Sequence, residues 1–167
     1  MGGVVNEKRF LSQLKVRLKD CYLQIWCEQN ANNDRYSWYS TFKENFGLEH
    51  YLNTLEIKKF RDVFVRFRFG INDLRINDRY TNTHDRKCPF CDEIEDEIHF
   101  LFKCPVYEHL RKKHFEQQKR KQTNNCTFLM QSKNKRVRSI AMYIFYAFKL
   151  RQQKLELLSC VQQADQV

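Results

Sequence analysis

The apolar residues of this chain recur mainly at steps of three and four, the spacing that places side chains on one face of an α-helix. The first such stretch covers residues 6–30, and its basic residues Lys15, Arg17 and Lys19 fall outside the apolar stripe. We therefore expect an amphipathic helix whose stripe packs against the rest of the protein. The stripe, with Cys21 as a buried member, consists of Leu11, Leu14, Leu18, Cys21, Tyr22, Ile25 and Trp26.

Shorter helices are expected at 37–46, at 48–53 and at 55–70, the last of them capped by Thr54. The run 63–69 alternates between apolar and other residues, which a β-strand would also do. A helix is preferred because the apolar pattern extends back to residue 55, beyond the usual length of a strand.

The C-terminal part continues the helical pattern. A helix follows residue 104, a packed turn is expected at 128–130, and a last helix of about twenty residues starts near Lys135, with a frayed tail after Cys160. The residues expected to face inward are Val106, Tyr107, Leu110 and His114 in the first of these helices, and Val137, Ile140, Ile144, Ala147 and Phe148 in the last.

The fold class predicted is mostly α, a helical domain with one small Cys3His loop that resembles a zinc knuckle. Four glycines and two prolines in 167 residues favour long helices over a turn-rich sheet. We divide the chain into an N-terminal helical region (1–80), a zinc-binding segment (81–115) and a basic helical region (116–167), which together form one cooperative unit.

The loop is predicted from the array Cys88, Cys91, His99 and Cys104, with the spacing C-x2-C-x7-H-x4-C. Three thiolates and one imidazole form the soft, tetrahedral donor set of a structural zinc site. We expect one structural Zn²⁺. Four protein ligands leave no open position for a water, which disfavours a catalytic zinc.

Two other uses of these cysteines remain open, a redox pair at Cys88 and Cys91 and a disulfide. A redox pair needs a strand-to-helix context, whereas the preceding residues 82–87 are polar and typical of a loop. Seven cysteines, an odd number, and no N-terminal apolar run favour an intracellular protein with free thiols. No apolar stretch approaches the about 18 residues of a membrane span. His109 and His114 are expected to support the site or lie at the surface rather than to add a fifth ligand.

An acidic run separates the two halves of the array and consists of Asp92, Glu93, Glu95, Asp96 and Glu97. We expect a solvated face, with Ile94 and Ile98 buried, rather than a cluster that binds Mg²⁺. The run can also cap the helix that carries His99. Its charge would repel a phosphate backbone from the tip of the loop.

The net charge of +10 predicts a polyanionic partner, because basic side chains neutralise phosphates and release counterions. Residues 105–138 contain ten basic and two acidic side chains. A solvated basic face without a partner is the competing interpretation, and Arg61, Arg66 and Arg68 can instead pair with carboxylates such as Asp62. The candidate nucleic-acid contacts are Arg66, Arg68, Arg111, Lys112, Lys113, Lys119, Arg120, Lys121, Lys133, Lys135, Arg136 and Arg138.

The motif Cys-Pro-Phe-Cys at 88–91, the acidic spacer, and His-Phe-Leu-Phe-Lys-Cys-Pro at 99–105 resemble the zinc-binding segment downstream of the reverse transcriptase in non-LTR (LINE-type) retrotransposon polyproteins. The arginine-rich stretch 66–80 and residues 106–111 are similar to the flanks of that segment. The resemblance covers about residues 55–111. It implies that Cys88, Cys91, His99 and Cys104 are metal ligands, and that the chain engages template RNA or target DNA.

The chain departs from those polyproteins because it contains no polymerase domain, no endonuclease and no pair of catalytic aspartates. We therefore predict a non-catalytic module that binds zinc and also RNA or DNA, with low sequence specificity. The alternative is a zinc-stabilised module that docks another protein, such as a reverse transcriptase domain. A redox protein is the third option.

Overall fold

The computed structural model describes residues 7–32, 37–43, 45–78, 80–115, 126–132 and 134–164. Across these ranges the chain is mostly helical and forms no strand beyond one antiparallel bridge between Lys87 and Ile94, so the predicted fold class is confirmed. The α-helices are α1 (Glu7–Ala31), α2 (Ser37–Ser40), α3 (His50–Thr54), α4 (Lys58–Arg68), α5 (Glu108–Phe115), α6 (Cys126–Met130) and α7 (Asn134–Ala164). Short helical turns lie between α4 and α5: η2 (Arg75–Asn77), η3 (Thr83–Asp85), η4 (His99–Lys103) and η5 (Pro105–Tyr107).

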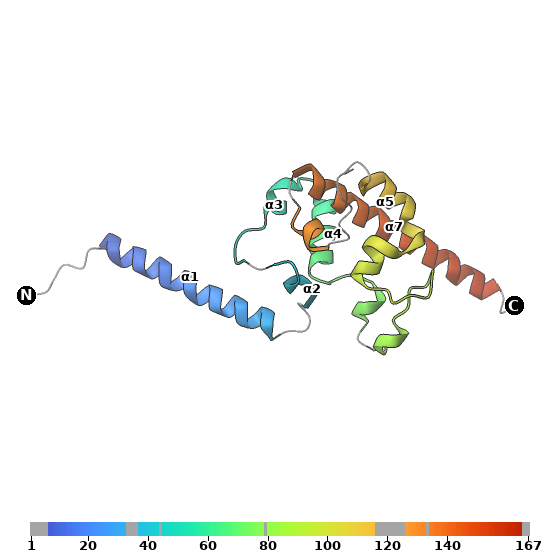
Figure 1. The fold of residues 1–167 in the computed structure, drawn as a ribbon, viewed down its shortest axis with the longest axis horizontal. Coiled ribbons are helices and arrows are strands. Elements are labelled where there is room, and N and C mark those ends of the chain that lie inside the picture. Colours follow the sequence, from blue (N-terminus) through green and yellow to red (C-terminus); the bar gives the residue numbers. More distant parts are fainter. Residues whose placement is uncertain are drawn as a thin grey trace, which may run out of the picture.

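Helix α7 is the central element, and α4, α5 and α3 pack against it (Figure 1). Four of its predicted inward side chains are fully buried: Val137, Ile140, Ile144 and Ala147. The fifth, Phe148, is partly buried, and Ala141, which was not predicted, is fully buried as well. Phe64 and Phe67 of α4 are equally buried. The ring of Phe100 stacks on Phe148 at 4.6 Å between centroids, and this contact joins the loop before α5 to the same core.

Arg68 is the cation at the centre of an aromatic box. Its side chain is 1% exposed, and its guanidinium lies 4.6 Å from the ring of Phe42 and 5.0 Å from that of Tyr51. It forms an ion pair with Glu49 at 3.1 Å and donates a hydrogen bond to the carbonyl of Met130. The prediction that Arg68 reaches phosphates is therefore wrong, since the residue instead ties α4 to segment 37–55 and to α6.

Helix α1 forms where the sequence predicts it, but the burial of its apolar stripe was predicted wrongly. The helix extends away from the other helices (Figure 1), and Leu11, Leu18 and Tyr22 are 45%, 50% and 62% exposed. Cys21, expected to be buried, is exposed as well. The described contacts of α1 with the remaining helices lie around α2, and the ring of Trp26 is 6.0 Å from that of Phe46.

The other helices differ from prediction mainly at their ends. The helix predicted at 37–46 is the single turn α2, and Thr54 ends α3 instead of capping α4. The α4 N-cap is Ile57 without a side-chain hydrogen bond, and the helix ends before Gly70, whose φ is +64°. The last helix has 31 residues instead of about twenty, and residues 161–164, which were predicted to fray, are helical.

Candidate metal centre

The first half of the centre is a tight turn around Cys88 and Cys91. The amide of Cys88 donates to the carbonyl of Glu93 at 2.6 Å, and the amide of Asp92 donates to the carbonyl of Cys88 at 3.2 Å. Asp92 adopts a left-handed φ of +61°, a conformation that aspartate tolerates better than most side chains. The chain thereby reverses direction directly after Cys91, and the two thiols lie on the same side.

The second half is a helical turn that Asp96 initiates. Its carboxylate accepts a hydrogen bond from the amide of His99 at 2.6 Å, the arrangement of an N-cap. The following turn, η4, is π-helical, and the amide of Cys104 donates to the carbonyl of His99 at 2.9 Å. This wide turn brings the backbone of Cys104 beside that of His99. The predicted capping of the helix that carries His99 by the acidic run is confirmed at Asp96.

The four donor atoms of Cys88, Cys91, His99 and Cys104 lie within 4.8 Å of one another. The sulfurs of Cys88 and Cys104 are 3.9 Å apart, and the sulfur of Cys91 is 3.3 Å from Nε2 of His99. A tetrahedral ion with zinc-like bond lengths would place two sulfurs about 3.8 Å apart, and a sulfur and a nitrogen about 3.5 Å apart. The sequence array is thus assembled into one group that can hold a metal ion.

The orientation of His99 also suits a metal ligand. Nε2 faces the thiols, while Nδ1 lies 3.2 Å from the carboxylate of Glu93. Histidines that bind metals usually donate their second ring N–H to such an acceptor, which fixes the ring and its tautomer. The sequence prediction did not give Glu93 this role, although its position two residues after Cys91 could have suggested it.

Close contact and burial shift the pKa values of the three thiols. The sulfur–sulfur contact, together with burial, raises the pKa of Cys88, whereas the same contact lowers the pKa of Cys104. Burial raises the pKa of Cys91. Because a metal ion binds thiolates, its binding would displace the thiol protons from this cluster.

Two carboxylates of the acidic run are buried, which corrects the prediction of a solvated face. Glu95 is 1% exposed and forms a two-bond ion pair with Arg151 of α7, with distances of 2.9 and 2.8 Å. Glu97 is also buried, and desolvation raises its pKa. Ile94, expected inside, is 43% exposed. The bridge at Ile94 and the cap at Asp96 interrupt any regular helix, so helical periodicity does not apply to this run.

Several candidate nucleic-acid contacts are engaged within the protein. Arg111 donates to the carbonyl of Cys104 at 2.6 Å and so supports the metal centre. Lys112 pairs with Glu108 at 2.7 Å, and Arg138 pairs with Glu56 at 2.9 Å.

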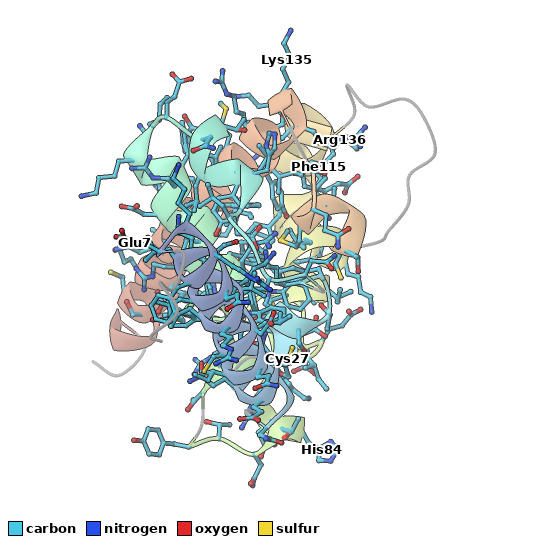
Figure 2. The ribbon with its side chains drawn as sticks, turned by 90° about the vertical axis from the view of Figure 1, so that its left-hand side faces the viewer. Glu7, Cys27, His84, Phe115, Lys135 and Arg136 are labelled. Atoms are coloured by element: carbon cyan, nitrogen blue, oxygen red, sulfur yellow. The ribbon has the colours of Figure 1, made fainter. Side chains whose placement is uncertain are left out.

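The remaining candidates occupy separate places. Arg66 and Lys113 are exposed on α4 and α5. Lys135 and Arg136 lie at the start of α7, at the opposite end of the molecule from His84 (Figure 2). Four predicted contacts lie outside the described residues: Lys119, Arg120, Lys121 and Lys133.

The spare histidines do not join the donor group. His114 is buried in α5 with its ring stacked on Tyr146, and His109 is exposed. The surface position expected for these histidines is found at His109, whereas His114 faces inward, as the helical pattern predicts, and packs on Tyr146.

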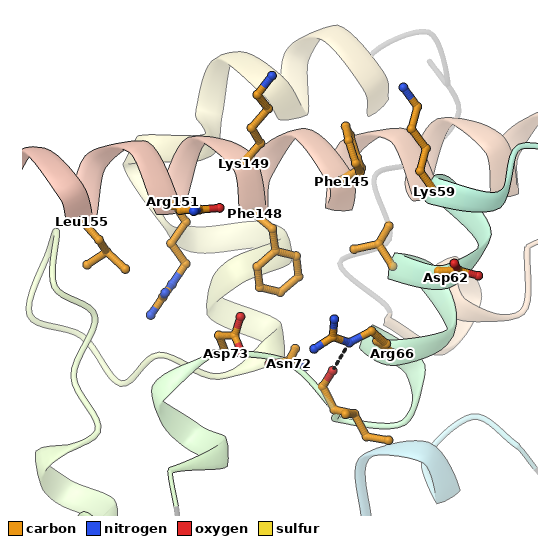
Figure 3. Close-up of a pocket in the computed structure, with 13 residues that line it drawn as sticks. Lys59, Asp62, Arg66, Asn72, Asp73, Phe145, Phe148, Lys149, Arg151 and Leu155 are labelled. Carbon is orange, nitrogen blue, oxygen red and sulfur yellow. Dashed lines mark hydrogen bonds between the residues drawn. The ribbon is translucent and has the colours of Figure 1, made fainter.

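A groove of about 780 Å³ lies between α4 and α7 (Figure 3). Lys59, Arg66 and Lys149 line it together with the rings of Phe145 and Phe148. Further lining residues are Asp62, Val63, Ile71, Asn72, Asp73, Arg151, Gln152 and Leu155. The sequence prediction missed Lys59 and Lys149, because they become neighbours only when α4 packs on α7.

Comparison of the chain with protein-family models, with curated proteins and with solved structures gave no match. No helix in the described part of the chain is both long enough and apolar enough to cross a membrane.

Proposed function

We propose that this chain is a zinc-stabilised, non-catalytic module that binds RNA or DNA with little sequence preference. The donor chemistry supports zinc, because three thiolates and an imidazole in a small tetrahedral cluster suit this ion. Four protein donors fill its coordination, which supports a structural rather than a catalytic role. The motif at 88–105 supports a relation to the segment that follows the reverse transcriptase in non-LTR retrotransposon polyproteins.

The observation that carries the nucleic-acid proposal is where the charges lie in the folded chain. The net charge is +10, and the buried charged side chains of the described residues are two arginines and two glutamates, Arg68, Arg151, Glu95 and Glu97. These four charges balance one another, so the core of the described residues holds no net charge that would offset the positive charge of the chain. The acidic run, which would repel phosphates if it were solvated, is partly withdrawn into the protein. A surface of this kind attracts polyanions.

We assign the bound nucleic-acid strand to the groove between α4 and α7. Lys59, Arg66 and Lys149 form no ion pair among the described residues, so no carboxylate neutralises their charges there. Nε of Arg66 donates a hydrogen bond to the carbonyl of Ile71 at 3.3 Å (Figure 3). The ammonium of Lys59 rests 5.2 Å from the ring of Phe145, at the groove itself. Cations beside aromatic rings are the usual composition of channels that bind single-stranded nucleic acid.

The test is the binding of a fluorescently labelled single-stranded oligonucleotide to the zinc-loaded chain over a series of salt concentrations. Affinity should fall steeply with salt. The double variant Lys59→Glu/Lys149→Glu should bind more weakly, with a salt slope lower by roughly 1 for each phosphate that is no longer neutralised.

The matched control is Lys58→Glu/Lys154→Glu, which makes the same charge changes on the same two helices at exposed positions outside the groove. Equal weakening in both variants would remove the groove from the proposal. Absence of binding by the wild-type chain at low salt would remove nucleic-acid binding altogether.

A protein-docking module is the second candidate, and the apolar side chains in the same groove favour it. Val63, Ile71 and Leu155 lie there beside the two phenylalanine rings, as in a groove that receives an amphipathic helix. Such an interaction would depend little on salt, and the salt series therefore separates the two candidates.

A further inference from the structure

Helix α1 presents an apolar stripe that no described residue covers. It has 25 residues, and Leu11, Leu14, Leu18 and Ile25 are between 41% and 50% exposed. Helices in proteins gain most of their stability from packing an amphipathic face rather than from helix propensity. A cover for the stripe would therefore stabilise α1.

The stripe follows a heptad. Leu11, Leu14, Leu18, Cys21 and Ile25 are separated by steps of three, four, three and four. These are the a, d, a, d and a positions through which two helices pack in a coiled coil. The next d position is Glu28, whose charge ends the seam.

The residues beside the seam favour a second copy of the same helix as the cover. In a parallel pair in register, each g residue meets the e residue of the following heptad on the other helix. Phe10 would then meet Lys15 of the second copy, and Arg17 would meet its Tyr22. Both are cation–aromatic contacts, and no two like charges oppose each other at these positions.

We propose that α1 pairs with α1 of a second copy in a parallel, in-register coiled coil through these five residues. This proposal is independent of the metal centre and of nucleic-acid binding. If both hold, the dimer would carry two grooves on one particle, and simultaneous engagement of a strand would raise its apparent affinity without new contacts.

Two exposed cysteines of α1 make the proposal testable in the full chain. Cys21 is at a d position and would face its counterpart across the seam, whereas Cys27 is at a c position and would point away. In a background with Cys126 and Cys160 changed to alanine, Cys27→Ala should cross-link to a dimer under mild oxidation. Cys21→Ala, which retains Cys27, should cross-link much more slowly. Equal rates for the two variants would overturn the proposal.

The mass of the chain in solution gives an independent readout. Light scattering should give twice the chain mass of 20.5 kDa for the wild type and for Val16→Asp, which changes an exposed apolar residue outside the seam. Leu18→Asp should give the mass of one chain at the same concentration, with its metal content unchanged. A mass other than twice the chain mass for the wild type, or dissociation of Val16→Asp as well, would overturn the proposal.

Discussion

At the scale of single residues, the geometry of the Cys3His donor group depends on side chains that are not among its four donors. Asp96 positions the backbone of His99, and Glu93 orients its ring. Arg111 holds the carbonyl of Cys104. Each of these contacts is local, so the donors are placed by the loop itself rather than by distant packing alone.

Glu93→Gln should weaken metal binding by about 10- to 100-fold, the usual effect of removing a carboxylate that orients a histidine ligand. The control is Asp92→Asn, because Asp92 is the neighbouring carboxylate but pairs with Lys87 instead, at 3.0 Å. Competition with a chromophoric chelator measures both affinities. Equal affinities in the two variants would show that Glu93 does not support His99.

His114 should make stability depend on pH. Burial, with a smaller contribution from Lys113, lowers its pKa below the ordinary 6.5. The stability that the neutral ring contributes is therefore complete above about pH 6.5 and is lost as the pH falls through the lower folded-state pKa.

His114→Phe removes this titration and keeps a ring that can stack on Tyr146. Urea unfolding at several pH values should show the variant gaining stability over the wild type as the pH falls below 6.5. The exposed His109 supplies the control His109→Phe. A constant difference between wild type and His114→Phe across this range would contradict the assignment.

At the scale of the elements, two polar contacts hold the loop that carries the candidate metal ligands against α7. The first is the buried pair Glu95–Arg151, and the second is the hydrogen bond from the Tyr143 hydroxyl to the carbonyl of Phe100, at 2.6 Å. These contacts join residues 43 to 56 positions apart in the sequence. They explain how the loop that carries the candidate metal ligands becomes part of the helical core.

Glu95→Gln should lower the free energy of unfolding by about 3–5 kcal/mol, because it leaves the buried Arg151 without its counter-charge. The control is Glu56→Gln, which breaks the exposed pair with Arg138 and should cause little change. Chemical denaturation of both variants makes the comparison. Similar small losses in the two would mean that the buried pair does not hold the loop on α7.

The helices themselves follow from local spacing, and this explains what could be predicted. The inward residues of α7 recur at helical spacing, and the candidate ligands of the loop lie close together in the sequence. Both could therefore be predicted from the sequence. The position of α1 cannot be predicted from local spacing. An apolar stripe indicates that the helix packs against another surface, but it does not show whether the same chain or another molecule supplies that surface. The burial of Glu95 was also hidden, since its partner Arg151 is 56 residues away.

At the scale of the whole molecule, the candidate metal centre and the helical core share one buried cluster. Cys88, Cys104, Phe100 and Tyr107 belong to the same buried cluster as the inward residues of α4 and α7. Two of the four candidate ligands, Cys88 and Cys104, are buried in this cluster, so a metal bound to them would contribute to the stability of the core. The folding free energy of the domain should therefore include the free energy of metal binding.

The proposed function depends on a zinc ion at the Cys3His donor group, and metal content by elemental analysis tests this most directly. The chain would be purified without added metal, together with Cys91→Ala and the control Cys160→Ala, which removes an exposed thiol outside the donor group. We expect about one zinc for each chain in the wild type and in the control. Cys91→Ala should contain no zinc and should unfold at a lower denaturant concentration than the wild type. A cooperatively folded wild-type chain without metal would contradict the account.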